Sequence, residues 1–249
     1  MSGHSKWASI KHKKAAADTK RGKVFTKLIR EITVVAKQGG GDPETNPKLR
    51  TVIQTAKAAN MPADNIDRAI KKGTGELPGV TYEAVTYEGY GPAGVALFLQ
   101  VMTDNKNRTV AEVRHVLTKW GGNLGSNGSV SWIFKQKGVI TIELNATTEN
   151  KLMEAALDAG AEDITSDTGS FEVVTPPEAL EDVKAAIEKK GIPIVSSEIT
   201  MQPSNMVKLT TEKDANAMLR LYEALEEMDD VQKVYANFDI EQSLLEKVA

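Results

Sequence analysis

The sequence of 249 residues contains no cysteine and only three histidines, and these absences exclude several kinds of chemistry. Without thiolates the chain can form no disulfide bond, iron–sulfur cluster, zinc–thiolate site or cysteine nucleophile. The histidines His4, His12 and His115 are widely spaced, so no two stand four residues apart on one helix face as a helical zinc site requires. We therefore expect no metal site.

Long apolar runs are also absent. No stretch approaches the roughly 18 unbroken apolar residues that a membrane helix needs, and the N-terminus is polar and basic, without the apolar core of a secretory signal. The absence of cysteine fits a reducing compartment. We expect a cytoplasmic protein with no membrane partner. Its length favours two or three domains.

Nucleotide-binding motifs are missing in their proper context. Gly89, Gly91 and Gly94 have the spacing of the dinucleotide-binding fingerprint, but that fingerprint needs a helix N-terminus directly after the glycines. Here Pro92 interrupts, and residues 95–103 have the pattern of a strand. A tight turn between strands explains the glycines better, since they adopt positive φ readily. No Walker A sequence occurs either, and we expect no cofactor.

Acidic pairs give little reason to predict catalysis. Asp229 and Asp230, for example, lie in an acidic region near the end of a predicted helix, where solvated surface is the usual explanation. We expect no catalytic residue and predict that the protein is not an enzyme. A site assembled from distant residues in a cleft between domains stays an alternative.

The net charge of −3 hides two segments of opposite character. Residues 1–73 hold 16 Lys and Arg against 6 Asp and Glu, a net charge of +10. Residues 74–249 hold 15 against 28, a net charge of −13. A locally basic module attracts phosphate whatever the rest of the chain carries. The charge distribution therefore favours a nucleic-acid partner for the N-terminal part.

The first 30 residues carry the strongest signal, because they contain nine Lys and Arg and the single acid Asp18. A merely solvated face normally interleaves both signs. Trp7 and His12 lie among the lysines, where an aromatic ring can stack on an unpaired base, although packing of Trp7 on the helices explains it equally well. The predicted contacts are Lys6, Trp7, Lys11, His12, Lys13, Lys14, Lys20, Arg21, Lys23, Lys27 and Arg30.

A second candidate surface lies in the otherwise acidic half of the chain. Residues 104–109 lead into a predicted helix, and we include Lys106, Arg108 and Arg114 among the nucleic-acid contacts. The alternative is purely structural, with Asn107 or Thr109 capping that helix.

Hydrophobic periodicity predicts three helices followed by α+β structure. The helices lie within residues 20–73, where the three consecutive glycines 39–41 end the first, Asn46 caps the second and Pro62 opens the third. Strands are predicted at 81–88, 95–103, 129–134, 138–144, 163–166, 170–175, 193–201, 206–210 and 231–238, and helices at 107–120, 147–159, 177–190 and 212–228.

This order predicts an α+β multidomain protein: a helical bundle followed by two α+β, ferredoxin-like domains, the last inserted into the middle one. The expected parts are a basic flexible tail (1–19), a helical nucleic-acid-binding domain (20–80), a discontinuous α+β domain (81–136 plus 205–240) and an inserted ferredoxin-like domain (137–204).

Several segments together resemble the YebC family. They are residues 3–8, 21–27, 39–43, 87–92, 104–109 and 128–134, in the same order along the chain. The resemblance implies three domains and a non-enzymatic cytoplasmic protein of bacteria, similar to a mitochondrial activator of translation of a cytochrome c oxidase subunit. Many members are labelled probable DNA-binding transcriptional regulators, and others look like ribosome-associated translation factors that relieve stalling at proline runs. The family offers no catalytic residues to carry over.

We therefore expect a monomeric, nucleic-acid-binding regulator of gene expression. Its partner is DNA, or ribosomal or transfer RNA on the ribosome. A lysine-rich tail suits irregular RNA, and no helix arrays Arg, Asn or Gln to read a major groove, although a helix-turn-helix within residues 20–73 stays open. The alternative from another class is a protein-interaction adaptor whose acidic α+β domains bind a protein partner.

Overall fold

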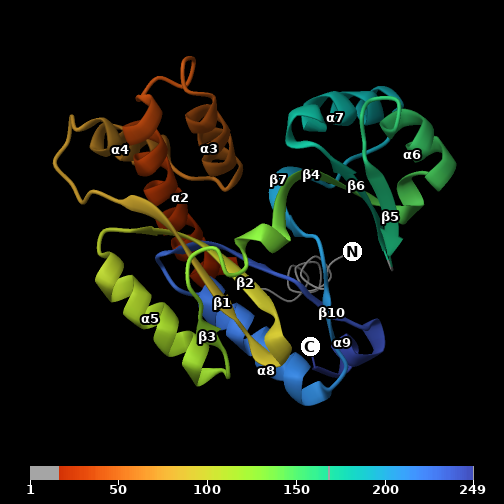
Figure 1. The fold of residues 1–249 in the computed structure, drawn as a ribbon. Coiled ribbons are helices and arrows are strands. Elements are labelled where there is room, and N and C mark those ends of the chain that lie inside the picture. The colour runs from red at the N-terminus through yellow and green to blue at the C-terminus, as the bar shows by residue number, and fades with distance from the viewer. Residues whose placement is uncertain (1–16, 168, 249) are drawn as a thin grey trace.

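The computed structural model describes residues 17–167 and 169–248 (Figure 1). The helical region comprises α2 (Ala17–Gly39), α3 (Pro47–Ala58) and α4 (Ala63–Thr74). The following elements are β1 (Glu83–Tyr90), η1 (Pro92–Gly94), β2 (Ala96–Thr103), α5 (Lys106–Lys119), β3 (Asn123–Leu124), η2 (Ser131–Ile133), β4 (Phe134–Glu143), η3 (Leu144–Ala146), α6 (Glu149–Ala156), β5 (Asp163–Asp167), β6 (Ser170–Thr175), η4 (Pro177–Ala179), α7 (Leu180–Lys189) and β7 (Ser196–Pro203). The chain continues with β8 (Val207–Leu209), α8 (Glu212–Glu226), β9 (Val231–Ala236), β10 (Phe238–Ile240) and α9 (Gln242–Val248).

The three helices pack around one apolar cluster, as their periodicity predicts. Ile32 of α2 and Leu49 of α3 are fully buried in it, together with Ile66 of α4. Asn46 joins α2 to α3, since its Oδ1 accepts a hydrogen bond from the Leu49 N–H at 3.1 Å while its Nδ2 donates to the Gly40 carbonyl at 2.9 Å. One amide side chain thus begins α3 and satisfies a carbonyl at the end of α2.

The first sheet has the strand order β3-β1-β2-β9 and is antiparallel throughout. The inward-facing residues of β2 and β9 pack with those of α5 and α8 in a single apolar core. The β1–β2 hairpin turns at η1, where Ala93 and Gly94 have φ values of 57° and 75°. A turn between strands is confirmed here, but of the three predicted glycines only Gly94 has a positive φ, and Gly89 lies within β1. β9 returns to this sheet from the far end of the chain.

The second sheet, of order β5-β6-β4-β7, is built from the intervening part of the chain, and α6 and α7 pack on one of its faces. In Figure 1 the second sheet lies on the opposite side of the molecule from α5, and its residues Phe134 and Met201 pack against Phe98 and Tyr235 of the first sheet. β8 and β10 form a separate two-stranded parallel pair.

Three sequence predictions are wrong in detail. The strand predicted at 129–134 is instead a loop that leads into the 3₁₀ turn η2. The strand predicted at 231–238 is divided, because the Asn237 side chain accepts a hydrogen bond from the Ala96 N–H at 2.7 Å and donates to the Asn205 carbonyl. Helix α9 was not predicted, although its Leu245 is buried in the core of the first sheet.

Candidate nucleic-acid interface

The structure describes the side chains of six of the fourteen predicted contact residues. Lys6, Trp7, Lys11, His12, Lys13 and Lys14 lie outside the described residues. Lys20 and Arg21 fall within α2, but their side chains are likewise outside the description. The remaining six are Lys23, Lys27 and Arg30 on α2, and Lys106, Arg108 and Arg114 on α5.

The α2 cations contact the C-terminal end of α8. Lys27 Nζ donates to the Glu226 carbonyl at 2.8 Å, Lys23 Nζ donates to the Glu227 carbonyl at 3.3 Å, and Arg30 Nη1 donates to the Asp229 carbonyl. The last carbonyls of a helix have no intrahelical partner and carry the negative end of the helix dipole. In this structure Lys23, Lys27 and Arg30 therefore join the helical region to the part of the chain that builds the first sheet.

Asp230 binds one arginine from each of the two predicted surfaces. Its Oδ1 accepts from Arg30 Nη1 at 2.6 Å, and its Oδ2 accepts from Arg108 Nη2 at 2.8 Å. The hydroxyls of Thr103 and Thr109 donate to the same Oδ2 at 3.1 and 2.5 Å. Asp230 is only 4% exposed, so the prediction that this acidic pair is solvated surface is wrong for Asp230.

Burial by itself raises the pKa of Asp230, but hydrogen bonds from Thr109 and Arg108 and the positive charge of Arg30 together hold that pKa below its ordinary value. Asp230 is thus a charged carboxylate held by two guanidinium groups from different parts of the fold. Sequence reasoning missed it, because nothing in the local pattern distinguishes Asp230 from its exposed neighbour Asp229.

The other α5 residues are surface groups. Lys106 pairs with Glu83 at 2.6 Å, with both side chains more than half exposed. Such pairs stabilise a fold little. Arg114 is exposed and forms no ion pair within the described part of the chain. The cap of α5 is Asn105, whose Oδ1 accepts from the Arg108 N–H at 3.0 Å, so the predicted caps Asn107 and Thr109 are wrong.

A second set of cations, not among the predicted contacts, lies exposed on α3 and α4. We call it the α3–α4 basic surface: Arg50, Lys57, Arg68, Lys71 and Lys72. Within residues 17–167 and 169–248, none of these five forms an ion pair.

Two residues of this surface line a groove between α3 and α4. Lys57 and Lys71 both line a groove of about 660 Å³ between α3 and α4. Helical spacing puts Arg68 and Lys72 on one side of α4, while Arg50 lies two turns from Lys57. Three acids, Asp42, Asp67 and Glu76, line the same groove and partly neutralise the charge of Lys57 and Lys71. The other three cations of this surface, Arg50, Arg68 and Lys72, lie outside the groove lining.

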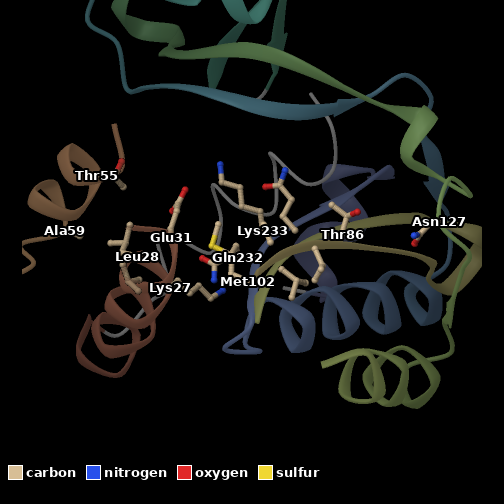
Figure 2. A pocket seen from close by; sticks show the side chains of 15 residues that line it. Lys27, Leu28, Glu31, Thr55, Ala59, Thr86, Met102, Asn127, Gln232 and Lys233 are labelled. Carbon is tan, nitrogen blue, oxygen red and sulfur yellow. The ribbon is translucent and has the colours of Figure 1, made fainter. Parts of the chain in front are cut away.

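A cleft of about 760 Å³ lies between α2 and the strands β1, β2 and β9 of the first sheet (Figure 2). Glu31 and Lys233 project into it from opposite sides. Gln232 also belongs to this lining, and its buried Nε2 has no hydrogen-bond partner among the residues that the structure describes. Burial raises the pKa of Glu31, and the positive charge of Lys233 opposes the rise. The other lining residues include Gln100, Asn127, Thr86, Met102, Leu28 and Lys27.

This cleft offers amide and hydroxyl groups together with the charged side chains of Lys27, Glu31 and Lys233. No cluster of three His, Cys, Asp or Glu side chains able to hold a metal occurs among the described residues. In the same part of the chain, no helix combines the length and the apolar character needed to cross a bilayer. The amide, hydroxyl and charged groups of the cleft can therefore position a ligand through hydrogen bonds and ionic contacts.

Comparison with known proteins gives consistent matches over the whole chain. A family model described as the TACO1/YebC protein N-terminal domain matches residues 5–76, and one described as the TACO1/YebC second and third domain matches residues 82–238. A relative from Geobacter sulfurreducens, named "Probable transcriptional regulatory protein GSU1074", is 59% identical over 248 residues, covering 100% of both chains.

A similarly named relative from Persephonella marina is 56% identical, again over 100% of both chains. The crystal structure of a conserved hypothetical protein, Aq1575 from Aquifex aeolicus, superimposes with a TM-score of 0.81 at 52% identity, covering 95% of this chain and 97% of that one. The names of the Geobacter and Persephonella relatives describe regulatory proteins rather than enzymes, in agreement with the sequence prediction.

Proposed function

Since the chain belongs to the TACO1/YebC family, we propose that it regulates gene expression by binding nucleic acid through its basic N-terminal module. The observation that carries the proposal is the charge separation along the chain: +10 over residues 1–73 and −13 over the rest. Phosphate is the natural partner of such a module. The relatives' names support a role in transcription, and hence contact with DNA.

The proposed contacts fall into two groups. The first holds the predicted tail and helix residues Lys6, Trp7, Lys11, His12, Lys13, Lys14, Lys20 and Arg21, to which the α3–α4 basic surface is added. The second holds Arg114 and Lys106 on α5. The other four predicted residues have a different proposed role. Lys23 and Lys27 donate to carbonyls at the end of α8, and Arg30 and Arg108 bind Asp230, so these contacts hold the helical region against the first sheet.

The character of α4 favours contacts to the nucleic-acid backbone over base readout. In a helix-turn-helix, the N-terminal residues of the second helix contact base edges in the major groove. Here the N-terminal half of α4 carries exposed Asp64 and Asp67, and its cations come near the C-terminal end. Carboxylates at this end would repel the phosphates of DNA, so a DNA-reading role for α4 is disfavoured. We therefore propose more specifically that the partner is an irregular RNA, including RNA on the ribosome.

We also propose that the protein acts as a cytoplasmic monomer with a discontinuous middle domain (81–136 plus 205–240) and an inserted domain (137–204). Two features support this division. β9 pairs with β2 in the first sheet, and the second sheet is built entirely from strands that lie between them in the chain.

The experiment that tests the proposed function compares two partners at equal salt. The full chain is sedimented with ribosomes, and separately passed over immobilised duplex DNA. Retention by either supports nucleic-acid binding, and the stronger of the two identifies the target class. Recovery of neither, together with a protein partner captured by a chain that lacks residues 1–19, favours the adaptor alternative.

A further inference from the structure

Trp132 stands out from the other aromatic residues of the described chain. Its side chain is 67% exposed, and it is the one aromatic residue in that part of the chain that is exposed. The residues around it are buried: Val130, Ile133 and Phe134 are each at most 6% exposed. Tryptophan usually buries most of its large surface. An indole left in solvent between buried neighbours therefore calls for a functional explanation.

The 3₁₀ geometry of η2 explains why this ring faces solvent. With three residues per turn, Val130 and Ile133 lie on one side, where they pack with Phe98 and Tyr235 on the outer face of the first sheet. Trp132 falls on another side. Its Nε1 donates to the Ser129 carbonyl at 3.1 Å, so the polar atom of the indole has a partner within the chain. What remains exposed is mainly the apolar ring.

The loop that carries Trp132 is held by a buried carboxylate. Glu88, 5% exposed, accepts hydrogen bonds from the N–H groups of Gly128 at 2.7 Å, Val130 at 2.7 Å and Ser131 at 2.8 Å. Burial alone raises the pKa of Glu88, but these three donors bring that pKa below its ordinary value. Such a pre-organised loop loses little conformational freedom when a ligand binds.

The surroundings of Trp132 favour a nucleobase over a protein partner. Hydrophobic protein interfaces present an apolar patch, whereas the preceding loop at 125–131 is made of Gly, Ser and Asn around the buried Val130. Exposed Lys135 follows three residues later and forms no ion pair within the described chain. The same loop supplies Asn127 to the rim of the cleft, where Figure 2 shows its amide at the far end from α2.

We propose that Trp132 is a stacking platform for an unpaired base of a single-stranded nucleic acid, with Lys135 near its phosphates. Aromatic side chains recognise unstacked bases in this way, and duplex bases are not available to them because they are already stacked. The inference rests on the proposed function and deepens it, since it assigns a single-strand contact outside the basic N-terminal module.

The test measures binding of the full chain to a 12-nucleotide oligo(U) and to an RNA duplex of the same length. Trp132→Ala should weaken oligo(U) binding by about tenfold and leave duplex binding unchanged. Trp132→Phe should retain most of the affinity, because a phenyl ring also stacks. Val195→Ala is the matched control, since Val195 is 62% exposed and apolar but lies just before β7 of the second sheet; it should change neither affinity.

A second readout uses a chain in which Trp7 and Trp120 are replaced by Phe, leaving Trp132 as the one fluorophore of its kind. Saturating oligo(U) should quench its fluorescence. Unchanged oligo(U) affinity in Trp132→Ala, an equal loss on duplex and single strand, or a Trp132-dependent protein partner with no effect on oligo(U) would overturn the proposal. If the wild-type chain binds neither probe this inference fails, and if it also binds no duplex DNA the proposed function fails with it. Salt-dependent wild-type binding that Trp132→Ala leaves intact removes this inference alone.

Discussion

Arg30 of α2 and Asp230 before β9 form an ion pair of 2.6 Å between residues 200 positions apart in the sequence. Both side chains are largely buried, at 13% and 5% exposed. The contact joins the basic helical region to the acidic α+β part, so part of the charge separation in the sequence is neutralised within the molecule. The cations proposed for an external partner are those of the tail and the start of α2, of the α3–α4 basic surface, and Lys106 and Arg114 on α5.

Replacing the shared carboxylate should destabilise the fold strongly. In Asp230→Asn, Arg30 and Arg108 lose their common charged partner, and breaking a buried pair in this way costs about 3 kcal/mol of unfolding free energy. Urea denaturation measures the loss. Asp229→Asn is the control, because the Asp229 side chain is exposed and only its carbonyl is used; the change there should stay within about 0.5 kcal/mol. Equal effects in the two variants would contradict this role for Asp230.

The same carboxylate should make stability depend on acid pH. The pKa of Asp230 is lower in the folded chain than its ordinary value, so the unfolded chain binds the proton more readily. Its contribution is complete above the unfolded pKa of about 4 and is lost as the pH falls through the lower folded value. Urea midpoints measured from about pH 6 to pH 2 should fall at the acid end, and less steeply in Asp230→Asn. Parallel curves for wild type and variant would count against this assignment.

Removing the charge of Glu88 should loosen the loop that carries Trp132. In Glu88→Gln one acceptor oxygen is lost, and three backbone N–H groups lose a charged partner, for an expected cost of about 2 kcal/mol. The Trp132 fluorescence anisotropy should also fall in a chain without the other two tryptophans. Glu83→Gln provides the comparison, because Glu83 forms an exposed pair with Lys106, and the loss of such a solvent-screened pair should change stability little. A rigid indole in Glu88→Gln would show that the loop is held by other contacts.

The helices and most strands follow from the sequence because their periodicity is local. The two strand failures have a common physical cause, since they occur where a distant side chain occupies backbone hydrogen-bonding groups. Glu88 takes the N–H groups of residues 128, 130 and 131, which prevents the predicted strand. Asn237 similarly replaces a ladder bond and divides the last strand. The sequence around a predicted strand does not indicate that a distant side chain such as Glu88 or Asn237 will bind its backbone.

The same reasoning applies to the candidate site. The charge pattern identified Arg30 and Arg108 as notable cations, and the structure shows them sharing one buried carboxylate. Their partner Asp230 was interpreted as surface, because pairing across 200 residues leaves no trace in sequence spacing. Residue type predicted charge, whereas the fold decided which charges face one another and which face solvent.

The salt dependence of binding tests the central claim most directly. Each phosphate neutralised on duplex DNA adds about 0.9 to the log–log slope of affinity against salt, and about 0.7 on a single strand. Lys71→Ala with Lys72→Ala, in the last turn of α4, should make the slope shallower by up to about two on duplex. The matched change at Lys189 and Lys190, at the end of α7, should leave it unchanged. Binding that is insensitive to salt, or that responds equally to both double variants, would contradict a basic N-terminal interface.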